Sequence, residues 1–267
     1  MFRLISQEER LKISNSLYNE WRYRMVTGGQ KAWIIKHSGN EDFAKRDQLG
    51  FLLGKDFCNI SEVKTLSEQE LENIKQFSSP GEYFNSSNTI LVRLAHSYSI
   101  EELPNKTLEE AVATELVYSV WVRRRDAHTE NRVYVKGIPI FFDFHVAFLG
   151  EPNLSDINVF FSQTEDYGRA GLWRVKTWGD FLKQFTGSIH PNAIGPFHFV
   201  NDTESFYQHV KLTKTKLKEK VSSKIDDYVQ RVKFDSVREA EIIKFLKKNL
   251  ETLDQDVNKM VETIRQD

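Results

Sequence analysis

The chain has 267 residues, with 37 basic and 38 acidic side chains and a formal net charge of −1. This length allows one large domain or two smaller lobes with a hydrophobic core. The balanced charge gives no indication of binding to nucleic acid or to a charged membrane surface.

The sequence also predicts the cellular location of the protein. No apolar run approaches the about 20 residues that a transmembrane helix needs, and the N-terminal residues lack the apolar core of a signal peptide. The single cysteine, Cys58, excludes an internal disulfide framework and suits a reducing compartment. We therefore expect a soluble, cytoplasmic protein without a membrane span.

A glycine-containing hairpin is predicted near the start of the chain. Two strand-like runs flank a turn that contains Gly28 and Gly29. Backbone N–H groups of such a turn can lie over phosphates, so both glycines are candidate phosphate-binding positions. The second run, residues 32–36, is apolar and ends in Lys36, a candidate phosphate-binding side chain. Lys31 competes with it, but its place in the turn predicts that it points to solvent.

A helix is predicted over residues 41–57, with Leu49 and Leu53 on its apolar face. A lysine that binds phosphates can be held by a carboxylate on the helix that follows it. Asp47 is the first choice for that carboxylate because it lies in the middle of the helix, near the apolar face. Glu41 is the second choice, because at the N-terminus it can serve the helix dipole instead.

The predicted secondary structure changes near the middle of the chain. A helical patch near residues 67–77 and a clear strand over residues 89–94 are followed by mainly helical sequence. Strands dominate before this point and helices after it. The pattern predicts an α+β fold with two lobes, a β-rich N-terminal lobe of residues 1–98 and a larger helical lobe of residues 99–267.

A capped helix leads into the most polar loop of the chain. Residues 107–110, Thr-Leu-Glu-Glu, form a capping box that opens a helix through about Val122. One face of that helix is apolar: Leu108, Val112, Leu116 and Val120. Three arginines follow at residues 123–125. They are either a solvated last turn, where cations are favoured, or a phosphate-binding group.

The loop and the hairpin after it carry three polar residues in a suggestive order. Asp126 is followed five residues later by Asn131, and a hairpin over residues 133–142 turns at Lys136 and Gly137 and ends just before Asp143. Phosphoryl transfer in kinase-like sites uses one Asp to orient the attacking hydroxyl, and an Asn and a second Asp to hold Mg²⁺.

Two long helices are predicted at the C-terminal end, over residues 203–233 and 236–265. The apolar residues of the second alternate at spacings of three and four, as in a coiled-coil seam. Packing on the helical lobe is the favoured interpretation, because the pattern covers at most three heptads. The alternative is a homodimer formed through residues 236–265.

Several of these stretches together carry a resemblance to a known group of proteins. They are Trp33-Ile-Ile-Lys36, Arg46-Asp47 with Leu52-Leu53-Gly54, Trp121 with Asp126-x-His128-x-x-Asn131, and Phe142-Asp143-Phe-His-Val-Ala-Phe148. Over roughly residues 20–150 the chain resembles the atypical kinases that include the HipA toxin kinases and the phosphatidylinositol 3- and 4-kinases. It departs from kinases in having Arg124-Arg125-Asp126 for His-Arg-Asp and Asp-Phe-His for Asp-Phe-Gly.

The resemblance implies ATP and Mg²⁺ as cofactors and a hydroxyl-bearing acceptor as the partner. It implies that Asp126 is the catalytic base, that Asn131 and Asp143 bind Mg²⁺, and that Lys36 binds phosphate. His96 follows the strand at which the adenine would lie, so we also expect it to contact the nucleotide.

Two other functions remain open from the sequence. The pairs Asp126-x-His128 and Asp143-x-His145 could ligate zinc, manganese or iron in a metal-dependent hydrolase. A pseudokinase that binds nucleotide without turnover is the third interpretation, although all the catalytic residue types are present.

Overall fold

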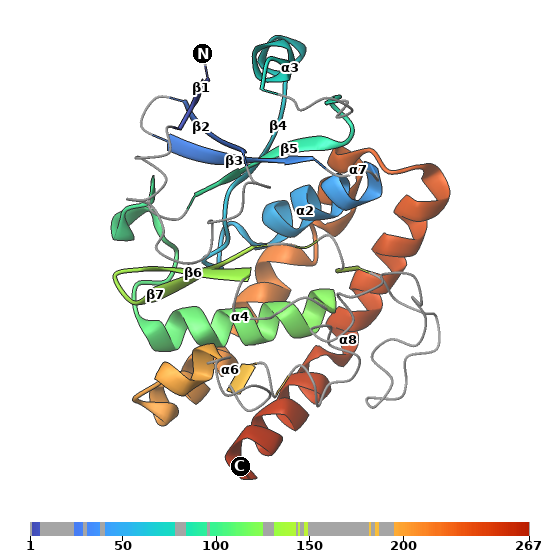
Figure 1. The fold of residues 1–267 in the computed structure, drawn as a ribbon. Helices are drawn as coiled ribbons and strands as arrows, with labels where there is room; N and C mark the ends of the chain where they lie inside the picture. Colours follow the sequence, from blue (N-terminus) through green and yellow to red (C-terminus); the bar gives the residue numbers. More distant parts are fainter. Residues whose placement is uncertain are drawn as a thin grey trace, which may run out of the picture.

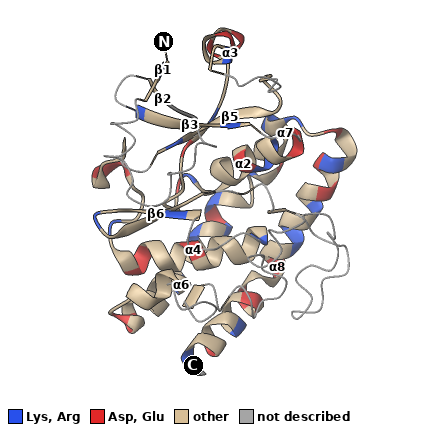
Figure 2. Ribbon diagram, viewed as in Figure 1, with Lys and Arg blue, Asp and Glu red and all other residues tan. Residues whose placement is uncertain are grey.

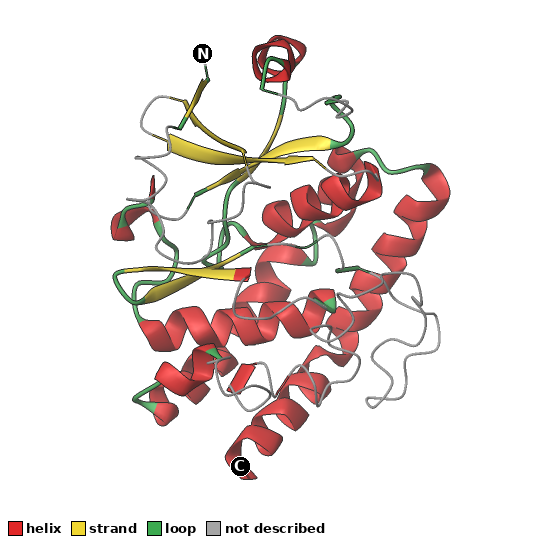
Figure 3. Cartoon of the chain, viewed as in Figure 1, coloured by secondary structure: helices red, strands yellow, loops and turns green. Residues whose placement is uncertain are grey.

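The five-stranded sheet lies in the upper part of the molecule, with one short helix above it and most of the other helices below it (Figures 1 and 3). The structure is a computed structural model, and it describes residues 2–5, 24–28, 31–37, 41–77, 84–94, 97–124, 131–142, 144, 147–148, 182, 185–186 and 195–266. The α+β class predicted from the sequence is confirmed for these residues.

The larger sheet is antiparallel throughout and has the strand order β1-β2-β3-β5-β4. Its strands are Arg3–Leu4, Arg24–Gly28, Lys31–His37, Thr89–Arg93 and Val63–Thr65 for β1, β2, β3, β5 and β4. The predicted hairpin is confirmed, because β2 and β3 pair up to Gly28 and Lys31. Strand β4 was not predicted, since its three half-exposed residues carry no apolar alternation.

Helices cover both faces of this sheet. Helix α3 (Glu68–Lys75), which begins with a capping box of Ser67 and Glu70, packs against one face. That face is formed by Trp33, Ile35 and Leu91. Helix α2 (Glu41–Gly54) lies against the other face, where Ala44 contacts Ile90 and Val92. The predicted helix over residues 41–57 is therefore confirmed, but it ends three residues earlier.

Helix α4 (Leu108–Val122) lies at the centre of the helical part. Its predicted cap is confirmed, since the Thr107 hydroxyl accepts from the Glu110 N–H and the Glu110 carboxylate accepts from the Thr107 N–H. The prediction of a single apolar face was wrong. Every residue from Ala111 to Val122 is buried, because other elements surround the helix on several sides.

Hairpin β6-β7 lies over α4 on one side (Figure 1). Its strands are Arg132–Val135 and Ile138–Phe141, and the turn between them has positive φ at Lys136 and Gly137, as in a type I′ turn. The predicted hairpin is confirmed. A parallel bridge between Ile60 and Phe141 joins it to the chain that leaves α2.

Helices α6 (Thr203–Val221) and α8 (Ser236–Gln266) pack on other sides of α4. The single helix predicted over residues 203–233 was wrong, because a turn at residues 222–224 separates α6 from α7 (Ile225–Val232). The apolar stripe of α8 is buried in the common core of the chain, so packing is its role here: Leu246, Leu253, Val257, Met260 and Ile264.

The charges on the described helices are mixed. Figure 2 shows both basic and acidic positions along α8, with several of them paired to neighbouring helices. Among the described helices, none combines the length and apolar character that crossing a membrane requires.

Candidate active site

Strand β3 and helix α2 bring Lys36 and Asp47 together. Side chains alternate across a strand, so Lys36 shares the α2 side of β3 with Ala32 and Ile34. Its Nζ lies 2.5 Å from Asp47 Oδ2. Asp47 is 2% exposed, and such a buried carboxylate requires charged or hydrogen-bonding partners. Glu41, the second choice from the sequence, pairs instead with Lys45 one helical turn along.

The other oxygen of Asp47 reaches a second part of the chain. Oδ1 accepts a hydrogen bond of 2.5 Å from the backbone N–H of Phe144, the residue directly after Asp143. One buried carboxylate therefore joins a strand lysine to the chain that leaves hairpin β6-β7. This arrangement couples the position of Lys36 to that of the segment carrying Asp143, the predicted metal ligand.

The Phe144 ring is held between α2 and α4 at a very close approach. Its ring centre lies 5.6 Å from that of Tyr118, whose hydroxyl donates to the Gly50 carbonyl at 2.5 Å. A Cβ at Gly50 would lie 2.4 Å from Phe144 Cγ, so only glycine fits there without movement. Burial raises the pKa of the Tyr118 hydroxyl, which therefore remains a donor at ordinary pH.

This close approach predicts different effects for two glycines of α2. We expect Gly50→Ala to destabilise the protein, because overpacking costs about 1–3 kcal/mol, against a gain of about 1 kcal/mol in helix propensity. Gly54→Ala is the matched control, since its Cβ would meet Tyr118 at 3.2 Å, which requires only a small shift. Denaturant unfolding measures both. Equal stability of the two variants would mean that the packing of the Phe144 ring does not require a glycine at position 50.

Asn131 lies where the loop enters the hairpin. It is 6% exposed, and its carbonyl accepts the N–H of Phe142 at 3.1 Å. Residues 131 and 142 are therefore adjacent, which brings Asn131 to the end of the hairpin that leads to Asp143. Arg124 Nη2 donates to both carbonyls, at 3.2 Å to Asn131 and 2.6 Å to Phe142.

The first two arginines of the triplet do not form a solvated helix end. Arg123 and Arg124 are 5% and 0% exposed, so that interpretation was wrong for these two residues. Arg123, with φ of 54°, caps α4 and pairs with Asp256 of α8 at 2.8 Å. Arg125 lies outside the described residues.

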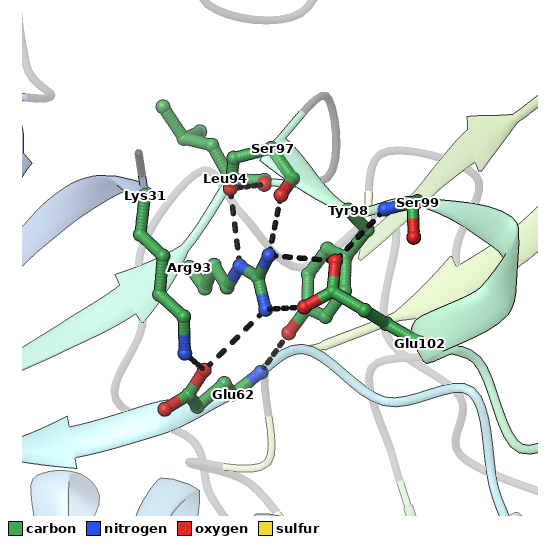
Figure 4. Close-up of polar contacts among 8 residues, drawn as sticks. All are labelled: Lys31, Glu62, Arg93, Leu94, Ser97, Tyr98, Ser99 and Glu102. Atoms are coloured by element: carbon green, nitrogen blue, oxygen red, sulfur yellow. Dashed lines mark hydrogen bonds and ion pairs between the residues drawn. The ribbon is translucent and has the colours of Figure 1, made fainter. Parts of the chain in front are cut away.

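A polar network fixes the chain as it leaves β5 (Figure 4). Arg93 forms a bidentate ion pair with Glu102 of the short helix η2 (Ile100–Glu102), with distances of 2.9 Å from Nη1 to Oε1 and 3.0 Å from Nη2 to Oε2. Its Nε donates to Ser97 Oγ at 3.2 Å, and its guanidinium lies 3.8 Å from the centre of the Tyr98 ring. These hydrogen bonds from Arg93 lower the pKa of the Glu102 carboxyl, which stays ionised.

The same network extends to β3 and to the start of β4 (Figure 4). Lys31 Nζ lies 2.8 Å from Glu62 Oε2, and the Glu62 N–H donates to the Tyr98 hydroxyl at 2.6 Å. The Lys31 side chain is 42% exposed, as predicted from its place beside the turn, but it is also paired with Glu62. The network holds the segment at which the sequence places the adenine.

Several predicted site residues lie outside the described residues: Gly29, His96, Asp126, His128, Asp143 and His145. Gly28 is described as the last residue of β2. The structure thus brings together Lys36 and Asp47, and it places Asn131 beside the residue before Asp143. Within the described part of the chain, no three His, Cys, Asp or Glu side chains group closely enough to hold a metal ion.

Sequence reasoning missed the residues that hold the site in place. Gly50 could have been noticed, because a glycine inside a helix lowers its stability and can have a packing reason. Glu115 could also have been noticed, as a charged residue within an apolar helix. No local pattern could have indicated the Phe144 N–H, because its partner lies 97 residues away.

The comparisons with known proteins give little. No protein-family model and no curated protein matches the sequence. Among solved structures, the fold is similar to that of the Helicobacter pylori proinflammatory kinase CtkA, with a TM-score of 0.44 and 11% sequence identity. The similarity covers 90% of this chain and 91% of that one.

Proposed function

We propose that the protein is an ATP- and Mg²⁺-dependent phosphotransferase with a two-lobed kinase-like fold, related to the atypical kinases, that transfers the γ-phosphate to a hydroxyl acceptor. The observation that carries this proposal is the double contact of Asp47. A buried acid that holds a strand lysine is the arrangement that fixes the phosphate-binding lysine in kinase-like sites, and the second oxygen of this acid also contacts the chain directly after Asp143.

The residues at the hairpin end suit Mg²⁺. This ion prefers carboxylate and amide oxygens, which Asp143 and Asn131 supply. The contact between the Asn131 carbonyl and the Phe142 N–H supports a shared site, because it brings the two ligands to the same end of the hairpin. When bound, Mg²⁺ would neutralise charge on the phosphates during transfer.

The remaining roles follow from the order of the residues. Lys36, fixed by Asp47, would hold the phosphates on the α2 side of β3. Asp126 would accept the proton of the acceptor hydroxyl, and the turn at Gly28 and Gly29 would lie over the phosphates. The base would lie beside the segment that the Arg93 network holds, near His96. The acceptor class, whether protein, lipid or small molecule, is left open.

Lys36 provides the test of this function. We expect Lys36→Met to reduce Mg²⁺-dependent ATP turnover by about 10²–10³-fold, the usual loss when one charge-stabilising group is removed. Lys64→Met is the matched control. Lys64 is on strand β4 of the same sheet and is also paired with a carboxylate, that of Glu70, but its register with Leu91 and Ile35 places it on the other face of the sheet. Turnover that falls equally in both variants would contradict the assignment.

The acid that holds Lys36 is tested in the same assay. Asp47→Asn should lower turnover, though less than Lys36→Met, because the amide can still accept from the Phe144 N–H but no longer attracts the ammonium group. Glu41→Gln should have no effect, since Glu41 pairs with Lys45 at the surface. Nucleotide binding without any turnover in the unaltered protein would favour the pseudokinase alternative.

A further inference from the structure

Two buried arginines and one buried glutamate form a cluster between helix α4 and the start of hairpin β6-β7. Glu115 of α4 accepts from Arg124 Nη1 at 2.9 Å and from Arg132 Nε at 2.8 Å. All three side chains are at most 1% exposed. Glu115 lies in the middle of α4, and its two partners are the residue after the C-cap of that helix, Arg124, and the first residue of β6, Arg132.

Such a cluster is not an efficient way to stabilise a fold. Burying charges has a large desolvation penalty, and apolar side chains of similar volume are often at least as stable in the same place. One carboxylate also leaves the cluster with a net positive charge, so its guanidinium groups need further acceptors. Arg124 finds two of them in the carbonyls of Asn131 and Phe142.

These two carbonyls mark the position of the candidate metal ligands. Asn131 is itself one ligand in the proposed function, and Phe142 directly precedes the other, Asp143. Arg124 Nη2 therefore bridges the strand that enters the hairpin and the strand that leaves it, at the end where both ligands lie. The guanidinium carbon is also 5.2 Å from the Phe141 ring centre and 5.3 Å from that of Phe144.

We propose that Arg124, held in place by Glu115, is a positioning residue that sets the spacing of the metal ligands Asn131 and Asp143. This inference rests on the proposed function. Arg124 touches neither metal nor substrate; it acts through the two main-chain carbonyls. Only the planar fork of arginine can bond a carboxylate with one nitrogen and two carbonyls with another, so lysine is not an equivalent replacement.

The neighbouring arginine provides a matched control. Arg123 is also buried, at 5% exposed, and forms an ion pair of similar length with Asp256, but the hydrogen bonds of the described residues do not join it to either of the two carbonyls. Arg123→Met and Arg124→Met each remove one buried ion pair from the same end of α4. A loss of stability common to both variants therefore reports on structure, and a difference between them reports on the metal ligands.

The apparent affinity for Mg²⁺ is measured by calorimetric titration of each folded variant in the presence of a non-hydrolysable ATP analogue. We expect Arg124→Met to weaken apparent Mg²⁺ affinity by about 10–100-fold, as removal of groups that orient metal ligands usually does. Arg123→Met should leave this affinity essentially unchanged. Affinity for the nucleotide without metal should be the same in both variants.

The outcomes separate this inference from the function on which it rests. If the unaltered protein binds Mg²⁺ with nucleotide but the two variants behave alike, Arg124 does not position the ligands and the inference is overturned. If the unaltered protein does not bind Mg²⁺ with nucleotide, both the function and the inference fail. Should Arg124→Met not fold, Arg124→Lys and Arg123→Lys give the same comparison, with a smaller expected difference.

Discussion

Replacement of Asp143 by alanine is expected to abolish turnover. In the proposed site its carboxylate is the main protein ligand of Mg²⁺, and alanine removes the charged oxygen that this ion requires. Magnesium-dependent nucleotide binding should weaken in parallel, while circular dichroism and thermal unfolding remain as in the unaltered protein.

Asp56→Ala serves as the control for this experiment, because it removes an exposed carboxylate just beyond α2. We expect that variant to retain its activity. An active Asp143→Ala enzyme would reject the assignment of Asp143 as a metal ligand.

Asp126 is expected to have an equally large effect on turnover but little effect on binding. A base that acts only on the acceptor hydroxyl does not have to hold ATP, so Asp126→Asn should leave ATP affinity nearly unchanged. Turnover should fall by roughly 10²–10⁴-fold, the usual contribution of general acid–base catalysis. Asn131→Ala should instead weaken the metal-dependent binding of nucleotide.

The same variants distinguish a phosphotransferase from a metal-dependent hydrolase. In the hydrolase, Asp126 and His128 would both be metal ligands, so His128→Ala would be as damaging as Asp126→Asn and bound transition metal would be lost in both. The proposed function requires Asp126 to be essential and His128 to be supportive. Elemental analysis of the purified protein should then find no tightly bound zinc.

The sequence predicted those parts of the fold that depend on neighbouring residues. The cap of α4 at Thr107 and the turn at Lys136 and Gly137 both follow from local chemistry, and both are confirmed. The choice of Asp47 over Glu41 rested on position within one helix. The observed contact between Asp47 and Lys36 agrees with that choice, while their role in nucleotide binding stays a prediction.

The errors have a common physical cause, because periodicity describes one element at a time. The apolar stripe through Leu217, Val221 and Ile225 keeps a spacing of four across residues 222–224, so it conceals the turn that separates α6 from α7. The predicted single face of α4 failed because the hairpin and other helices cover its remaining sides.

The contacts that hold the candidate site could not be predicted from local sequence patterns either. Arg124 was considered as part of a basic triplet, yet its partners are a glutamate nine residues earlier and carbonyls of a hairpin that follows. Arg93 is the last residue of β5 and follows three apolar residues, and its partners lie on η2 and before β4. Only the folded chain brings such groups together.

Transfer of radioactive label from ATP tests the central proposal most directly. The protein is incubated with cell lysate, Mg²⁺ and ATP labelled at either the γ- or the α-phosphate, beside Lys36→Met and Lys64→Met. The proposal predicts Mg²⁺-dependent labelling of an acceptor from γ-labelled ATP only, strongly reduced with Lys36→Met and retained with Lys64→Met. Labelling from the α-phosphate, or γ-labelling that is unaffected by Lys36→Met, would contradict it.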